Sequence, residues 1–172
     1  MGLPCPRFGL QIESISDFLD NPKRNEWLKA KMEQSRAEFK AIGFVGGPPC
    51  PDFSVAGKQA GAQGRHGQLS KVYMDAICSF LPDFFVFENV KGLLSTARHR
   101  AFFDTLVKQA RMAGYATDWR LLNSLNYGVA QDRDRVILFG VLEKHLRNGV
   151  PYLLALGVAE TLRDFLAREV RP

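Results

Sequence analysis

The sequence predicts an α/β fold with an open, mostly parallel sheet that ends in an antiparallel hairpin. Two observations carry this prediction. Short apolar runs of strand length alternate along the chain with amphipathic segments of helical spacing, and the runs at 41–45 and 83–87 each end abruptly in a polar or glycine-rich turn. The chain has 172 residues, 46% of them hydrophobic, which is enough for one modest core. We therefore expect a single domain over residues 1–172.

The first part of the chain predicts one strand, one helix and a second strand. Residues 8–15 are expected to form a short strand, and a break follows at residues 21–22. Asn25 can then cap an amphipathic helix, because charged side chains alternate there with apolar residues at helical spacing. The apolar run at 41–45 reads as a buried strand that leads into the rigid turn GGPP at 46–49.

The rest of the chain continues the alternation. Residues 55–70 hold four glycines and several basic residues, which predicts a mobile basic loop. The elements expected after it are a helix at 71–81, a strand at 83–87, a helix at 100–113, strands at 116–122 and 135–141, and a terminal helix at 160–170.

Polar residues gather where these strands end. Cys50 and Glu88 each follow a predicted strand, and ligands of open α/β sheets bind outside the carboxyl ends of the strands. If the last two strands form a hairpin, Gln131, Arg133 and Arg135 reach the same edge. The period of two then places these three side chains on one face and the two intervening aspartates on the other.

Three segments therefore converge on one edge: GGPPCPDFS around Cys50, FENV around Glu88, and QDRDR at 131–135. In this order, over residues 42–141, they resemble the cytosine-C5 DNA methyltransferase family. The resemblance implies a Rossmann-like methyltransferase sheet and the catalytic core of a DNA (cytosine-5-)-methyltransferase, as in restriction-modification systems. Its methyl donor would be S-adenosylmethionine, and its partner would be DNA with a cytosine flipped out of the duplex.

The resemblance also assigns roles. C5 of cytosine is a poor nucleophile until a thiolate adds to C6, and Cys50 would supply that thiolate. Glu88 would contact N3 and the 4-amino group of the base, drawing electron density from C6. Arg135 would bind O2 of the base, and Arg133 would help to hold the site in place. Asn89 and Gln131 would support these residues.

The donor side of the family pattern is incomplete. The glycine-rich loop of the family is not found, since Phe8-Gly9 lacks the aspartate and the other glycines, and no target recognition domain follows 141. The cofactor residues that the resemblance leaves are Pro49, Leu69 and Asp17. We expect an incomplete catalytic domain, as in a truncated gene product, an expressed fragment or one piece of a split enzyme. Without a neighbour, the strand at 41–45 would be an exposed apolar edge that favours self-association or a complementary chain.

Composition limits the setting. A net charge of +5 favours an acidic partner such as nucleic acid. Three widely spaced cysteines, without a CxxC pair, fit a reducing cytoplasmic compartment. Cys5 is expected to be structural or incidental, and Cys78 a core thiol. No stretch is long and apolar enough to span a bilayer. The histidines lack ligand spacing, so no metal site is expected and all three should be surface residues.

Other functions stay open. One branch resembling the family uses the same residues on transfer RNA, so RNA is an alternative substrate. The chain is alternatively an inactive remnant, or a subunit of a split methyltransferase, that binds nucleic acid or a partner chain. A thiol hydrolase using Cys50 with His66 or His99 is a third interpretation, although nothing in the sequence positions a histidine and an orienting acid.

Overall fold

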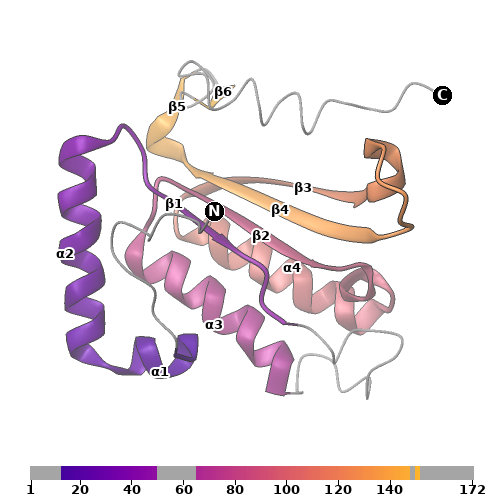
Figure 1. Cartoon of the computed structure of the whole chain (residues 1–172), viewed down its shortest axis with the longest axis horizontal. Helices are drawn as coiled ribbons and strands as arrows, with labels where there is room; N and C mark the ends of the chain where they lie inside the picture. Colours follow the sequence, from indigo (N-terminus) through magenta and orange to yellow (C-terminus); the bar gives the residue numbers. More distant parts are fainter. Residues whose placement is uncertain (1–12, 50–64, 148–149, 152–172) are drawn as a thin grey trace, which may run out of the picture.

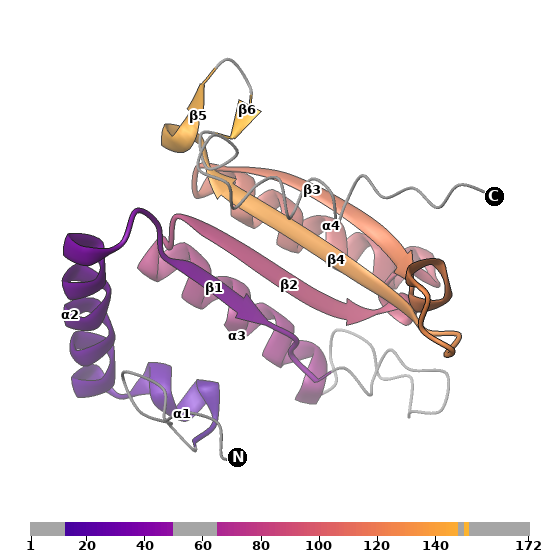
Figure 2. The same cartoon turned by 45° about the horizontal axis from the view of Figure 1, so that its top comes forward.

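The computed structural model describes residues 13–49, 65–147 and 150–151. A four-stranded sheet has helices α3 and α4 packed on one face, while α1 and α2 lie at its β1 side (Figures 1 and 2). No helix in these ranges is long and apolar enough to cross a membrane. The elements are α1 (Ile15–Asp20), α2 (Pro22–Glu38), β1 (Gly43–Gly46), α3 (Arg65–Phe80), β2 (Phe84–Val90), η3 (Lys91–Leu94), α4 (Ala97–Met112), β3 (Tyr115–Asn123), η4 (Ser124–Tyr127), β4 (Asp134–Leu142), η5 (Glu143–His145), β5 (Leu146–Arg147) and β6 (Val150–Pro151).

The main sheet has the strand order β1-β2-β4-β3. Strands β1 and β2 are parallel, whereas β4 pairs antiparallel with both β2 and β3. The α/β class and the antiparallel hairpin formed by β3 and β4 are as the sequence predicts. One of the three strand pairs is parallel, so the described part of the sheet has less parallel pairing than expected.

A single core lies between the sheet and the two helices. Along β2 and β4, alternate residues are buried, as the period of two requires when one face packs on helices. Phe85 and Phe87 are fully buried, and Phe85 meets Tyr115 edge to face with ring centroids 5.1 Å apart. The helices contribute Met74 and Ile77 from α3 and Phe103 and Leu106 from α4.

The start of the described chain differs from the prediction. Asn21 caps α2 by accepting a hydrogen bond from the backbone N–H of Lys23 at 3.0 Å, and Pro22 is the first helical residue. The sequence pattern at 21–22 was expected to break the chain, but Asn followed by Pro is also a strong helix start, since proline has the φ of a first turn and needs no donor there. Ile15 begins α1, so the expected strand at 8–15 does not extend to this residue.

Two further expectations are corrected. Helix α3 begins at Arg65, so residues 65–70 are helical and not part of a loop. His99 is buried rather than on the surface, and its Nδ1 lies 3.0 Å from the carbonyl oxygen of Gly92. Cys78 is partly buried against the core, as predicted. The predictions for Cys5, Cys50, Phe8-Gly9, 51–64 and 160–170 lie outside the described residues.

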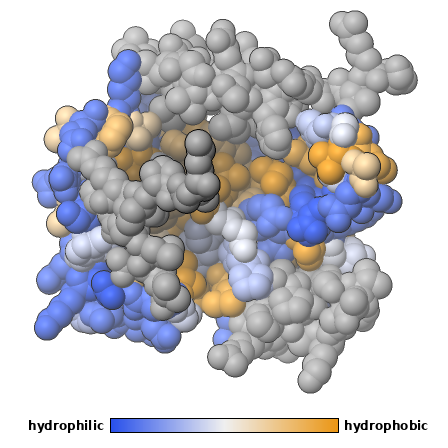
Figure 3. All heavy atoms as spheres, in the orientation of Figure 1, coloured by the Kyte–Doolittle hydropathy of each residue, from blue (hydrophilic) through white to orange (hydrophobic). Residues whose placement is uncertain are grey.

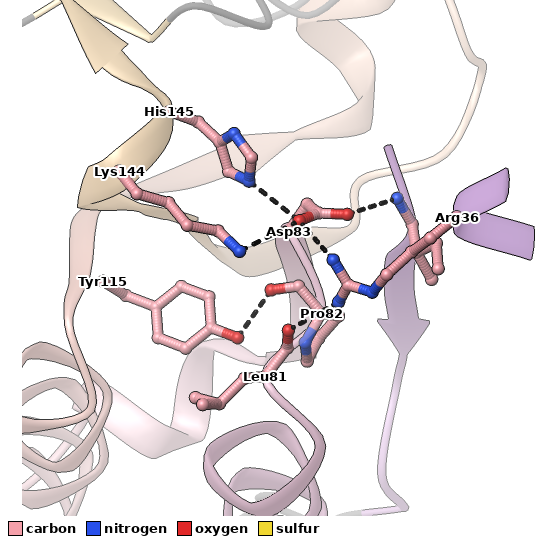
Figure 4. A network of polar contacts seen from close by, with 8 residues as sticks. Arg36, Leu81, Pro82, Asp83, Tyr115, Lys144 and His145 are labelled. Atoms are coloured by element: carbon pink, nitrogen blue, oxygen red, sulfur yellow. Dashed lines mark hydrogen bonds and ion pairs between the residues drawn. The ribbon is translucent and has the colours of Figure 1, made fainter. Parts of the chain in front are cut away.

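A polar cluster around Asp83 ties the elements together at the sheet edge where β2 begins (Figure 4). Asp83 is 3% exposed and accepts a hydrogen bond from the backbone of Ile42 at 2.9 Å. It also pairs with Arg36 at 3.0 Å, His145 at 2.8 Å and Lys144 at 3.8 Å. Burial alone would raise the pKa of this carboxyl, but the Ile42, His145 and Arg36 contacts together hold it below its usual range. The cluster joins α2, β1, β2 and η5 at one point.

Candidate active site

The centre of the candidate site is a pair formed by Glu88 and Arg135. Glu88 lies in β2 and Arg135 in the neighbouring strand β4, and Arg135 Nε is 2.6 Å from Glu88 Oε1. The side chains are 39% and 23% exposed, so the pair is partly shielded from water. Both belong to the alternating set that faces away from α3 and α4, because the intervening residues of both strands are buried in the core. The strands therefore bring together a carboxylate and a guanidinium 47 positions apart in the sequence.

The contact between the two groups is an ion pair without a hydrogen bond from Nε. Although Nε is near the carboxylate, its N–H does not point at the oxygen, and Nε is buried without a hydrogen-bond partner. Arg135 Nη1 donates to the carbonyl of Asp134 at 2.7 Å, which turns the guanidinium toward its own strand. A buried N–H donor without a hydrogen-bond partner costs free energy. A ligand atom that accepts a hydrogen bond from Nε would remove this cost.

The turn after β1 lies directly beside Glu88. A Cβ added to Gly47 would be 2.6 Å from Glu88 Oε2. Any residue other than glycine would therefore force this carboxylate or the turn to move. Asn89 Nδ2 donates to the carbonyl of Pro48 at 3.3 Å. The backbone two residues before Cys50 is thus held against the end of β2, and Cys50 itself lies outside the described residues.

Asn89 anchors this turn from inside the core. It is 2% exposed, its Oδ1 accepts from the backbone N–H of Val90 at 2.8 Å, and its Nδ2 also donates to Ser70 Oγ at 3.4 Å. Ser70 is fully buried on α3. The sequence predicted a supporting place for Asn89 but missed Ser70, because residues up to 70 were assigned to a loop. The sequence feature that could have identified Ser70 is its position as a serine within an apolar helical pattern.

In the segment QDRDR, the contacts separate the two aspartates from Arg135, as predicted, while the common face of Gln131, Arg133 and Arg135 stays a prediction. Asn123 Nδ2 donates to Asp132 Oδ1 at 2.6 Å and to Asp134 Oδ1 at 2.9 Å, whereas Arg135 turns to Glu88. Gln131 and Arg133 are exposed, and no ion pair joins Arg133 to Glu88. The structure therefore brings Glu88, Asn89 and Arg135 to the site, whereas the backbone carbonyls of Gln131 and Arg133 accept hydrogen bonds from Ser124.

A lysine that the sequence did not suggest completes this segment. Lys91 Nζ is 2.8 Å from Asp134 Oδ2. The hydrogen bond from Lys91, followed by that from Asn123, lowers the pKa of the Asp134 carboxyl, and the same bond to Asp134 raises the pKa of Lys91. Lys91 and Asn123 escaped prediction because their contacts depend on strand register, which one sequence does not reveal.

The one described thiol is chemically unsuited to attack. Burial, followed by the nearby Asp75 carboxylate, raises the pKa of the Cys78 thiol, so Cys78 stays protonated at neutral pH. Its Sγ lies 3.9 Å from the carbonyl of Gln109 on the helix layer. This agrees with the prediction that Cys78 is a core thiol.

The three residues predicted to hold a methyl donor lie on α1, on α3 and in the turn after β1. Asp17 and Pro49 are exposed and Leu69 is half-buried. A cavity of about 470 Å³ lies between α1, α2 and α3, but none of the three lines it. Its lining comes from Ser16, Leu19, Asp20, Asn25, Lys29, Val72, Asp75, Ala76, Ser79 and Phe80. The contacts of Pro49, Leu69 and Asp17 with the donor therefore stay a prediction.

Comparison with known proteins agrees with the geometry. The family model described as C-5 cytosine-specific DNA methylase matches residues 19–165. The type II methyltransferase M.NmeDI of Neisseria meningitidis serogroup C is 47% identical over 146 residues, which are 85% of this chain and 34% of that relative. The type II methyltransferase M.MthTI of Methanothermobacter thermautotrophicus is 38% identical over 144 residues, 84% of this chain and 42% of the relative. The chain thus spans less than half the length of these relatives.

Solved structures support the fold. A protein described as a DNA modification methyltransferase encoded within an E. coli prophage superposes with a TM-score of 0.55 at 23% identity, over 77% of this chain and 33% of the other. The family match covers both strands that carry Glu88 and Arg135 and the turn that precedes Cys50. This chain therefore belongs to the C-5 cytosine-specific DNA methylase family.

Proposed function

We propose that this chain carries the base-attacking part of a DNA cytosine-C5 methyltransferase. The observation that carries the proposal is the meeting of Glu88 with Arg135 beside the Gly47 turn, since three segments distant in sequence converge on one sheet edge. Residues 42–141 hold these segments, within a single but incomplete catalytic domain over 1–172. The family uses S-adenosylmethionine as its methyl donor.

In the proposed reaction the Cys50 thiolate forms a bond to C6 of cytosine. The electron pair of the C5–C6 double bond is then available at C5, which takes the methyl group. Loss of the C5 proton and release of the thiolate restore the aromatic ring. S-adenosylmethionine would supply the electrophilic methyl group when bound and would leave as S-adenosylhomocysteine; Pro49, Leu69 and Asp17 are its proposed contacts.

Glu88 and Arg135 would hold the base during this attack. The buried Nε of Arg135, which has no hydrogen-bond partner, is suited to a carbonyl acceptor such as O2 of cytosine. Glu88 would face N3 and the 4-amino group, where a carboxyl group can both donate and accept. A base that enters between them takes the place of their direct ion pair. Asn89 would fix the turn that carries Cys50 through its bond to Pro48.

The proposed substrate is DNA with the target cytosine flipped out of the duplex. Arg133 and Gln131 are exposed and would contact the nucleic acid or close the site. The net charge of +5 supports an acidic partner, and RNA is the alternative substrate. An intracellular location, near DNA, follows from the same proposal.

A second candidate function is that of a subunit completed by another chain or by a copy of itself. Val45 in β1 is 74% exposed, and β1 pairs with β2 but with no other described strand. Apolar side chains gather over the sheet on the face seen in Figure 3, in contrast to the mostly hydrophilic α2 at the left. An open apolar edge of this kind favours strand addition.

Covalent trapping tests the leading proposal. Duplex DNA containing 5-fluorocytosine forms a stable adduct only after methyl transfer, because fluorine cannot leave C5 as a proton does. DNA containing 2-pyrimidinone, a more electrophilic ring, accepts a thiolate without a donor. We expect an adduct with 2-pyrimidinone that Cys50→Ser abolishes and Cys5→Ser does not. A folded protein that forms no adduct with either DNA would contradict the proposal and favour the second candidate.

A further inference from the structure

A row of three polar side chains crosses three strand ends at the edge of the candidate site. Asn123 ends β3 and is paired directly with Asp134, which begins β4. On the other side, Val90 and Arg135 are the last paired residues of β2 and β4, so Lys91 lies one position beyond, level with Asp134. The carboxylate of Asp134 receives Lys91 Nζ at 2.8 Å on Oδ2 and Asn123 Nδ2 at 2.9 Å on Oδ1. Both of its oxygens are therefore held from opposite sides.

The row lies on the face opposite to the site. Asp134 shares its strand face with Val136 and Leu138, which are buried against the helices, whereas Arg135 belongs to the alternate set with Glu88. Because successive residues of a strand point to opposite faces, a fixed Asp134 fixes the direction of Arg135. Asp134, on the opposite face of β4, can thus determine the position of the Arg135 guanidinium.

Asn123 is itself held in place. Its Oδ1 accepts from the backbone N–H of Leu125 at 2.9 Å and caps η4, so its Nδ2 has one orientation. The same Nδ2 also reaches Asp132, and the backbone N–H of Ser124 donates to the carbonyl of Arg133 at 3.1 Å. The segment from Asp132 to Asp134 is therefore tied to the end of β3 by side-chain and backbone bonds.

We propose that Asp134 is a positioning residue for the base-binding guanidinium, acting through Lys91 and Asn123. This inference rests on the proposed function of Arg135. With the row intact, the start of β4 is locked to both neighbouring strands and Arg135 stands against Glu88. Without it, β4 would begin later, and the guanidinium would sample orientations in which it no longer meets Glu88 or a base.

The test compares Asp134→Ala with Asp118→Ala in the full chain. Asp118 is the matched control, because it is also a strand aspartate in an ion pair, with Arg120 at 3.2 Å, but it contacts Trp119 and Arg120 rather than the row. The first measurement is the heteronuclear NOE of the Arg135 Nε–Hε group in the free protein. We expect a marked fall in Asp134→Ala and no change in Asp118→Ala. An unchanged NOE in Asp134→Ala overturns the proposal, whether or not the chain is active.

The second measurement is the rate of adduct formation with 2-pyrimidinone DNA. Misplacement of Arg135 should slow the reaction by about tenfold or more at saturating DNA. Asp134→Ala removes a negative charge, which by itself would favour DNA binding and would not slow the reaction. Asp134→Glu, which keeps both acceptor oxygens, should recover part of the rate. If the parent chain forms no adduct, the proposed function fails while the NOE still decides the role of Asp134. If Asp134→Ala does not fold, Lys91→Met and Asn123→Ala each remove one contact, and an unchanged NOE in both overturns the proposal.

Discussion

Glu88 and Arg135 form a diagonal pair across the antiparallel strands β2 and β4. The residue directly opposite Glu88 is Ile137, and the residue opposite Arg135 is Val90, so the two side chains reach along the strands to place Nε 2.6 Å from Oε1. Diagonal neighbours are within reach of long side chains. Both groups remain partly exposed, which leaves the pair open to a planar ligand between or beside them.

Arg135→Lys tests whether geometry or charge matters in this pair. Lysine keeps the positive charge but loses the planar, multi-donor group that a base carbonyl and Glu88 can share. We expect the rate of adduct formation with 2-pyrimidinone DNA to fall by about a hundredfold, with little change in melting temperature. Arg120→Lys on β3 is the control and should keep the rate of the parent chain. Equal rates for Arg135→Lys and the parent would exclude a specific role for the guanidinium.

Gly47→Ala probes the turn that precedes Cys50. The new Cβ would be 2.6 Å from Glu88 Oε2, so either the carboxylate or the turn must move. The expected result is an adduct rate lowered by about tenfold or more. Gly46→Ala is an informative comparison, because its Cβ would meet the Tyr73 ring at 2.7 Å and should cost stability through overpacking, about 1 to 3 kcal/mol. The prediction fails if Gly47→Ala reacts as fast as the parent.

Ser70→Ala removes the buried hydroxyl that receives Asn89 Nδ2. We expect the free energy of unfolding to fall by about 1 kcal/mol, since one buried bond of the amide is lost while the bond to Pro48 remains. Urea unfolding followed by circular dichroism measures this change. Ser95→Ala, at an exposed hydroxyl that donates to the carbonyl of Gly92, is the control and should cost less. A larger loss for Ser95→Ala would contradict the assignment.

Asp83 should give the folded protein a specific sensitivity to acid. Its pKa is lowered in the folded state, so the ionised carboxylate contributes stability above the ordinary aspartate pKa of about 3.9, and this stability is lost as the pH falls through the lower folded value. Asp83→Asn should lower the free energy of unfolding at neutral pH by about 2 kcal/mol. Below about pH 4 the difference from the parent should shrink. Asp104→Asn, at an exposed ion pair, should not change this pH dependence.

The open edge of β1 predicts self-association. Val45→Lys places a charge on the exposed strand and should reduce the apparent mass measured by light scattering. Met112→Lys is the matched control, because Met112 is 80% exposed at the end of α4, away from the edge strand. A parent chain that stays monomeric at high concentration would contradict the prediction.

The sequence predicted most of the strands and both long helices that pack on the sheet, because alternation and helical spacing report directly on burial. It failed where one pattern has two structural readings. Asn21 before Pro22 fits a break as well as a helix cap, and the glycines before residue 65 extended the expected loop into α3. His99 was expected on the surface, but the carbonyl of Gly92 satisfies its ring in the interior.

The site was predictable in part. Cys50, Glu88, Asn89 and Arg135 stood out because their segments resemble a family pattern, and the structure brings the last two together with Glu88 at one edge. Ser70, Lys91 and Asn123 did not stand out. Their roles depend on which strand lies beside which and in what register, and this information comes from tertiary packing rather than local sequence.

Peptide mapping of the trapped adduct tests the central claim most directly. The protein is incubated with 2-pyrimidinone DNA, digested with protease and nuclease, and the modified peptide is identified by mass spectrometry. We predict that the nucleotide is attached to Cys50, and that Arg135→Lys and Gly47→Ala lower its yield without changing its position. Attachment to Cys5 or to Cys78, whose thiol pKa is raised by burial, would contradict the account.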